Sequence, residues 1–112
     1  MKEQDRDQDA RFRDDAKALR EIGAHLDAQL DRVTVRLPRA VAEAAMAAWE
    51  RDERAGPGRE SPARYALRDQ AAELALIGLA LSERGRREGE EYVVALDVAS
   101  AGAALRAFQQ SA

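Results

Sequence analysis

The sequence of 112 residues contains no cysteine and a single histidine, His25. The absence of cysteine excludes disulfides, thiolate metal sites and a cysteine nucleophile, and one histidine excludes a two-histidine metal motif within one chain. Apolar runs are short. The longest, around residues 71–81, cannot span a bilayer, and the first 15 residues lack the apolar core of a signal peptide. We therefore expect a cytoplasmic protein with little equipment for catalysis.

Groups that could carry out catalysis are scarce as well. No two carboxylates are spaced as a catalytic pair, and the adjacent Asp14 and Asp15 point to different sides of a helix. The stretch Gly56-Pro57-Gly58 is typical of a loop and is no phosphate-binding sequence. We therefore expect a protein that is not an enzyme and that needs neither a cofactor nor a metal.

Large apolar side chains are few. Hydrophobic residues make up 46% of the chain, but 25 residues are alanine, and aromatic residues amount to only 4%. A lone chain of this size with so few large side chains would have a thin core. Oligomerisation is the simplest remedy, because it buries additional apolar surface.

The N-terminal third divides into two parts. Residues 1–11 are dense in charge, and we expect them to be a disordered tail. Over residues 12–31 the apolar positions repeat at steps of three and four, which predicts an amphipathic helix. Its apolar stripe consists of Phe12, Ala16, Leu19, Ile22, Leu26 and Leu30.

The hydrophobic period changes at residue 32. Residues 32–37 read Arg-Val-Thr-Val-Arg-Leu, an alternation that predicts a β-strand, and Pro38 then fits the first turn of a helix. The helical period returns over residues 38–52, followed by a glycine- and proline-containing loop at 55–60. A second helix starts at Ser61-Pro62 and runs to about Gly85. Because it is apolar on most sides, it must be buried by another chain or by several packed layers.

The remainder of the chain predicts a charged linker at 84–91, a strand at 92–98 and an alanine-rich helix at 100–110. The expected order is therefore helix, strand, helix, helix, strand, helix. We divide the chain into a tail (1–11), an N-terminal helix (12–31), a core (32–85) and a C-terminal extension (86–112).

The strand RVTVRLP at 32–38, the amphipathic helix after it and the apolar helix from Ser61 resemble the ribbon-helix-helix family of DNA-binding proteins, the Arc and MetJ type. The resemblance covers residues 32–84, less than half of the chain. It implies a mainly α fold with a short β-ribbon, in which two copies pair their strands antiparallel and form an intertwined dimer. Such a two-stranded ribbon fits the major groove of DNA.

The resemblance also implies roles for individual residues. The outward-facing strand residues would read bases: Arg32, Thr34 and Arg36. The residues near the helix N-termini would contact phosphate: Arg39, Arg59, Ser61, Arg64 and Arg68. The dimer core would contain Val33, Val35, Leu37, Trp49, Leu74 and Ile77. Arginine can grip guanine with two hydrogen bonds, and the free amides of a helix start attract anions.

The sequence departs from the family pattern at three points. The loop between the two helices is longer than the usual short turn, about 31 residues precede the strand, and the segment from Tyr92 onward has no place in the minimal fold. Net charge is distributed unevenly, since residues 32–68 carry +3 while residues 1–31 and 69–112 each carry −3. The acidic flanks would weaken non-specific attraction to DNA without touching the reading face.

Two functions follow from these observations. The first is a homodimeric, sequence-specific DNA-binding repressor: an autoregulator, an antitoxin, or a control protein of a plasmid or mobile element. The second is a protein-interaction or scaffold dimer without DNA, which would bind its partner through the N-terminal amphipathic helix. In the DNA-binding protein, the terminal segments 12–31 and 92–112 are the expected sites for a toxin, an effector or a second dimer. Pairing of strand 32–37 with strand 92–98, without self-pairing of 32–37 across a two-fold axis, would favour the second.

Overall fold

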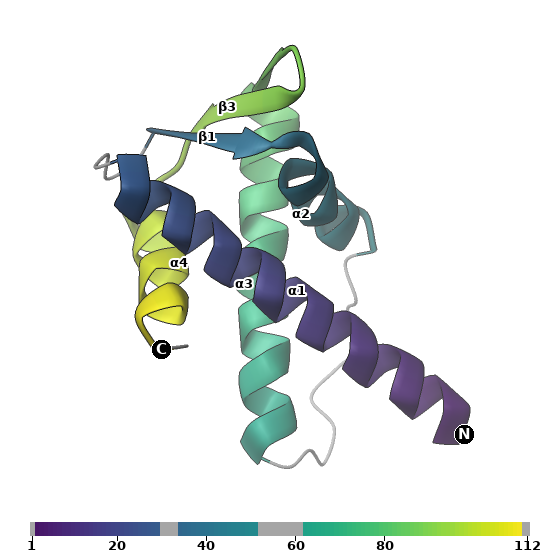
Figure 1. Cartoon of the computed structure of the whole chain (residues 1–112). Coiled ribbons are helices and arrows are strands. Elements are labelled where there is room, and N and C mark those ends of the chain that lie inside the picture. Colours follow the sequence, from purple (N-terminus) through teal and green to yellow (C-terminus); the bar gives the residue numbers. More distant parts are fainter. Residues whose placement is uncertain (1, 30–33, 52–61, 111–112) are drawn as a thin grey trace.

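The computed structural model describes residues 2–29, 34–51 and 62–110, with side chains for 10–29, 34–50 and 69–110. Within these residues the chain is mainly helical, with four helices and a three-stranded antiparallel sheet (Figure 1). In chain order the elements are α1 (Lys2–Gln29), β1 (Thr34–Pro38), α2 (Arg39–Arg51), α3 (Pro62–Arg84), β2 (Arg86–Glu88), β3 (Glu91–Ala95) and α4 (Val98–Gln110).

Helix α1 begins at Lys2, although residues 1–11 were expected to be disordered. The physical reason is the low cost of extending an existing helix. Each added residue gains a hydrogen bond once a turn has formed, and residues such as Lys, Glu, Gln, Arg and Ala have high helix propensity. The charged composition of this segment therefore does not prevent it from continuing the amphipathic helix that follows.

The strand order in the sheet is β1-β3-β2. Strand β1 pairs antiparallel with β3, from Thr34 opposite Ala95 to Pro38 opposite Glu91. Strand β2 lies in the segment 84–91, which had been expected to be a linker, and it pairs with β3 in a hairpin. The hairpin turns at Gly89, whose φ of 66° is the left-handed conformation that glycine adopts without strain in a two-residue hairpin loop.

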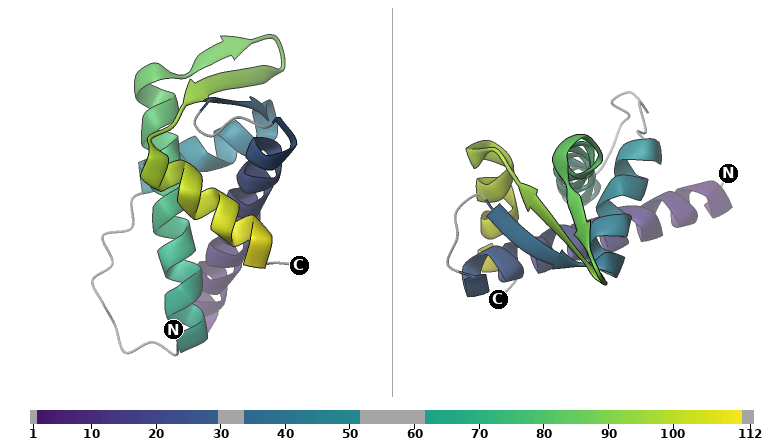
Figure 2. Two further views of the ribbon diagram at one scale, coloured as in Figure 1. Left: turned by 90° about the vertical axis from the view of Figure 1, so that its left-hand side faces the viewer. Right: turned by 90° about the horizontal axis from the view of Figure 1, so that it is seen from above.

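Helix α3 runs through the centre of the molecule, where it contacts α1, α2, α4 and β3. The sheet lies across the end of the bundle near the α3 C-terminus, with its inner face toward the helices (Figure 2). The largest side chains with less than 2% exposure come from four elements, α1, β1, α3 and β3: Leu19, Ile22, Leu26, Val35, Leu37, Leu74, Ile77 and Val94. The C-terminal segment thus shares the core of residues 34–84 and is not a separate appendage.

Helices α2 and α3 pack closely at Gly78. A Cβ atom at this position would overlap the backbone carbonyl of Ala45 on α2. The close approach requires glycine, and it holds α2 where its apolar face, including the buried Ala42 and Ala45, reaches the core.

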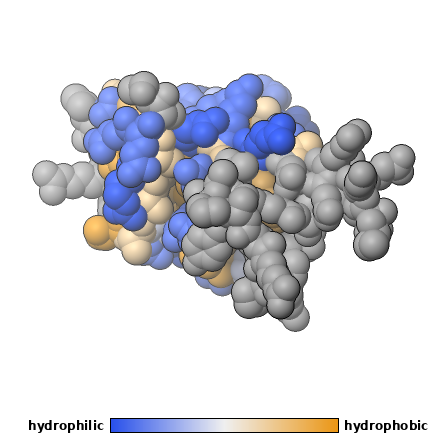
Figure 3. Space-filling view, turned by 90° about the horizontal axis from the view of Figure 1, so that it is seen from below, coloured by the Kyte–Doolittle hydropathy of each residue, from blue (hydrophilic) through white to orange (hydrophobic). Residues whose placement is uncertain are grey.

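At the end of the molecule opposite the sheet, hydrophilic side chains border a strip of hydrophobic ones, among the residues coloured in Figure 3. In the part of the chain that the structure describes, no helix combines the length and the apolar character needed to cross a membrane.

Candidate nucleic-acid interface

Strand β1 alternates between a buried and an exposed face, as the sequence predicts. Val35 and Leu37 are fully buried against the helices, whereas Thr34 and Arg36 are exposed on the outer face of the sheet. This alternation follows from the period of two in a strand, which places successive side chains on opposite faces. The two predicted base-reading residues that the structure describes therefore lie side by side on a solvent-exposed surface.

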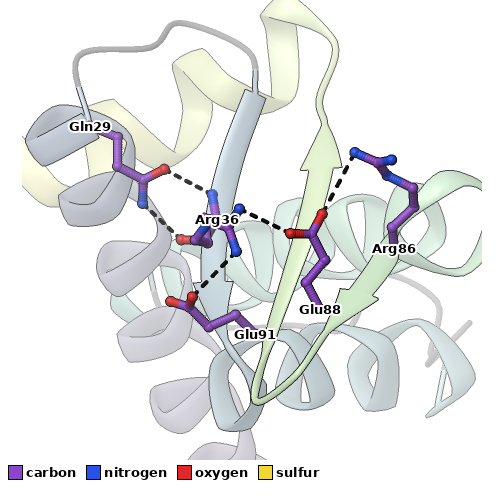
Figure 4. A network of polar contacts seen from close by, with 5 residues as sticks. All are labelled: Gln29, Arg36, Arg86, Glu88 and Glu91. Carbon is purple, nitrogen blue, oxygen red and sulfur yellow. Dashed lines mark hydrogen bonds and ion pairs between the residues drawn. The ribbon is translucent and has the colours of Figure 1, made fainter.

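The outer face around Arg36 carries equal numbers of positive and negative side chains. Residues opposite each other in neighbouring strands share a face, so Arg36, Val93 and Arg86 form one row across the sheet. The next row includes Glu91 and Glu88. We call Arg36, Arg86, Glu88 and Glu91 the outer-face network (Figure 4).

Arg36 is the centre of the outer-face network. Its Nη2 lies 3.1 Å from Oε1 of Glu88 and its Nη1 lies 3.4 Å from Oε1 of Glu91. Arg86 Nη2 lies 3.7 Å from the other Glu88 oxygen. The hydrogen bond and the charge of Glu88 raise the pKa of Arg36 further above its ordinary value, so the guanidinium stays positive. These ion pairs are exposed to water, and such pairs contribute little to stability.

The edge of β1 that faces away from β3 is covered by a side chain. The Gln29 Nε2 donates to the backbone oxygen of Arg36 at 2.7 Å, and the Arg36 backbone N–H donates to Gln29 Oε1 at 2.8 Å. Since the N–H and C=O of one strand residue point to the same side, both groups of Arg36 face this second edge. Pro38, two residues on, has no N–H to offer there.

Arg39, a predicted phosphate contact, is the first residue of α2 and also meets glutamates. Its Nε lies 3.2 Å from Oε1 of Glu43, and its Nη1 lies 3.8 Å from Oε2 of Glu90 at the hairpin turn. Its backbone N–H donates to the Glu90 carbonyl at 2.9 Å. The β2–β3 hairpin therefore supplies carboxylates to both described arginines of the predicted interface.

Several predicted site residues fall outside what the structure describes. These are Arg32, Val33, Arg59 and Ser61, together with the side chains of Arg64 and Arg68. The described part thus places Thr34, Arg36 and Arg39 along β1 and directly after it, from the residue opposite Ala95 to the hairpin turn at Glu90. The predicted phosphate cluster around the start of α3 stays a prediction.

The predicted dimer-core residues lie mostly inside the single chain. Val35, Leu37, Leu74 and Ile77 are fully buried there, while Trp49 is only partly buried. The described members of the α1 stripe, from Phe12 to Leu26, are all buried, and Leu19, Ile22 and Leu26 belong to the same core cluster. The stripe proposed for a partner protein is therefore used within the chain itself.

Sequence reasoning missed Gln29 and the three hairpin glutamates Glu88, Glu90 and Glu91. The glutamates belong to the segment 84–91, which the sequence predicts to be a charged linker. The available signal for a hairpin was Gly89, which lies between the charged residues 86–88 and 90–91 and shortly before the predicted strand. Nothing in the local sequence indicates that Gln29 meets the backbone seven residues later.

In the part of the chain that the structure describes, no cluster of three or more histidines or carboxylates is arranged to hold a metal ion. Comparison of the chain with models of protein families, with curated proteins and with solved structures found no match.

Proposed function

We propose that the protein binds double-stranded DNA as a homodimer, reads the major groove with two paired copies of β1, and acts as a transcriptional repressor. An autoregulator, an antitoxin and a plasmid or mobile-element control protein are the contexts that this role would fit. The observation that supports the proposal is the position of β1. It is an edge strand whose outward residues are Thr34 and Arg36 and whose inward residues are buried.

The pairing of β1 with β3 is compatible with a ribbon between two copies. It uses one edge of β1, and the Arg36 backbone groups face the other edge. A second copy pairing there would join the two three-stranded sheets into one and would set two Thr34 and two Arg36 side chains in a row. Threonine can bond a base edge or contact a thymine methyl, and arginine can bond guanine O6 and N7.

The glutamates of the outer-face network do not prevent this role. The side chains of Arg36, Glu88 and Glu91 are all more than 40% exposed, and exposed ion pairs exchange partners easily. On DNA, a phosphate or a base edge would replace the carboxylates. Because the two arginines and two glutamates of the outer-face network balance in charge, we expect the affinity for DNA to depend more on base contacts than on non-specific attraction to phosphate.

The test is selection of a preferred site from random duplexes, followed by affinity measurements with an Arg32→Ala/Thr34→Ala/Arg36→Ala variant. We expect the variant to lose specific binding while it stays folded and dimeric. Arg13→Ala, which removes an exposed arginine on α1, is the control and should bind as the wild type does. Unchanged affinity of the triple variant for the selected site would contradict the proposal.

A second candidate function is a protein-interaction or scaffold role without DNA. It is favoured by the pairing of β1 with β3 and by the glutamates that hold Arg36 and Arg39. Since the α1 stripe is buried in the chain, a partner would contact other apolar side chains, such as Leu76 and Val98, which are 48% and 77% exposed.

Retention on non-specific DNA or heparin as a function of salt separates the two functions. Steep weakening with salt indicates release of counterions from phosphate and supports the DNA-binding role. Failure to bind either matrix at low salt favours the protein-interaction role.

A further inference from the structure

Arg36 is held at both its backbone and its side chain. Gln29, the last residue of α1, bonds the Arg36 N–H and C=O, while Glu88 and Glu91 from the hairpin bond its guanidinium. These are the groups that the proposed DNA-binding function would use: the backbone for strand pairing and the guanidinium for base contact. In the single chain, Gln29 therefore occupies the Arg36 backbone groups, and Glu88 and Glu91 bind its guanidinium.

The Gln29 contact imitates a neighbouring strand. A glutamine side chain ends in an amide with the same donor and acceptor as a peptide group. Its two hydrogen bonds to the Arg36 backbone, at 2.7 Å and 2.8 Å, reproduce the pair of hydrogen bonds that a residue of an antiparallel strand would make there. Natural proteins protect sheet edges from other strands by such covering and by edge prolines, and Pro38 ends this edge.

We infer that the single chain is a closed state, in which Gln29 blocks the pairing edge of β1 and Glu88 and Glu91 sequester Arg36. This inference rests on the proposed function and adds its regulation. The chain becomes competent for DNA when the β1 strand of a second copy displaces the Gln29 amide and DNA displaces the two carboxylates.

The contacts are suited to reversible opening. Gln29 and both carboxylates are exposed, so the groups that leave are taken up by water. A partner strand replaces each hydrogen bond from the Gln29 amide with a hydrogen bond from its own backbone, so the number of hydrogen bonds is conserved. Because each Arg36 carries its own pair of glutamates, two Arg36 side chains can approach across the new ribbon without unscreened repulsion. Opening is then governed by protein concentration and by DNA.

The first test measures the monomer–dimer equilibrium by analytical ultracentrifugation and the hydrogen exchange of the Arg36 amide. In Gln29→Ala we expect at least about tenfold tighter dimerisation, because the monomer loses its two competing bonds. We also expect faster Arg36 amide exchange in the dilute monomer. Gln29→Glu, which cannot donate to the Arg36 carbonyl, should act in the same direction while keeping the helix end intact.

Gln109→Ala, at an exposed glutamine on α4, is the control and should change neither quantity. The same dimerisation constant and the same Arg36 amide exchange in the wild type and in both Gln29 variants would overturn the inference.

The second test measures binding to a duplex of random sequence at low salt. We expect Glu88→Gln/Glu91→Gln to tighten binding about tenfold more than Glu50→Gln/Glu83→Gln, which removes the same charge elsewhere. Equal affinity of both double variants would overturn the carboxylate part of the inference and leave the DNA-binding function standing. Tighter dimerisation of the Gln29 variants without binding to any duplex would instead overturn the proposed function and leave the edge contact established.

Discussion

The two faces of β1 differ in what holds their side chains. On the inner face, Val35 and Leu37 have no exposed surface and pack among apolar residues of the helices and β3. On the outer face, the Arg36 side chain makes exposed ion pairs with Glu88 and Glu91 of the β2–β3 hairpin. Burial fixes the inner residues tightly, whereas the outer residues can exchange partners. The fold therefore depends on one face of a five-residue strand, and the other face is available for function.

The largest effect is expected from Leu37→Ala on the inner face. The variant removes buried methyl groups and leaves a cavity, which costs about 2–5 kcal/mol of unfolding free energy. Chemical denaturation followed by circular dichroism measures the loss. Arg36→Ala changes the preceding residue, which lies on the outer face of β1, and it should leave the denaturation midpoint nearly unchanged. Similar losses for the two variants would contradict the division between the faces.

A smaller effect is expected from Gly78→Ala, which acts on the packing behind the inner face. The added methyl overlaps the Ala45 carbonyl and pushes α2 away from α3, at a cost of about 1–3 kcal/mol. Gly102→Ala on α4 is the matched control, because its Cβ meets only the flexible end of Arg106 at 3.2 Å. The control should be neutral or more stable. Equal melting temperatures of Gly78→Ala and the wild type would show that α2 and α3 can move apart at this contact without loss of stability, and would contradict the prediction.

The smallest effect is expected at Asp97, an exposed residue that nevertheless supports the fold. Its Oδ1 accepts the Ser100 N–H at 2.7 Å and caps the N-terminus of α4. This hydrogen bond is the main cause that lowers the pKa of Asp97 below its ordinary value. The folded pKa lies below the unfolded one, so the stabilisation is complete above the unfolded pKa and is lost as the pH falls through the folded value.

The stability difference between the wild type and Asp97→Ala should therefore shrink in acid, as measured by thermal unfolding at a series of pH values. Asp97→Asn keeps a capping oxygen but no charge, and it should show a smaller deficit at neutral pH. A difference between wild type and Asp97→Ala that is constant over this pH range would show that the cap is not the cause.

Local patterns predicted most of the elements, and contacts between distant segments explain what was missed. The alternation of Val35 and Leu37 with Thr34 and Arg36 predicted β1 and its faces. Strand β2 was missed because Arg86, Arg87 and Glu88 have no apolar member to reveal a buried face. The sequence left two pairings open for β1, one with the strand at 92–98 and one with β1 of a second copy, and the chain shows the first.

The candidate site was less accessible to sequence reasoning than the elements that carry it. Arg36 was identified from its position in β1, but its partners come from the end of α1 and from the hairpin, more than fifty residues further along the chain. Their meeting depends on the register of the sheet and on the path of the backbone, neither of which a local pattern contains.

The strand order has a consequence for how the chain folds. Helix α1, α2 and α3 can associate early through contacts between neighbouring segments, but β1 finds its partner only after the whole of α3 and the hairpin have been synthesised. Closing such a long loop before its contacts form slows the search for the native state. During synthesis on the ribosome, β1 therefore emerges well before β3. Because the Gln29 amide covers only the edge that faces away from β3, the other edge of β1 stays open to strands of other nascent chains until β3 pairs with it.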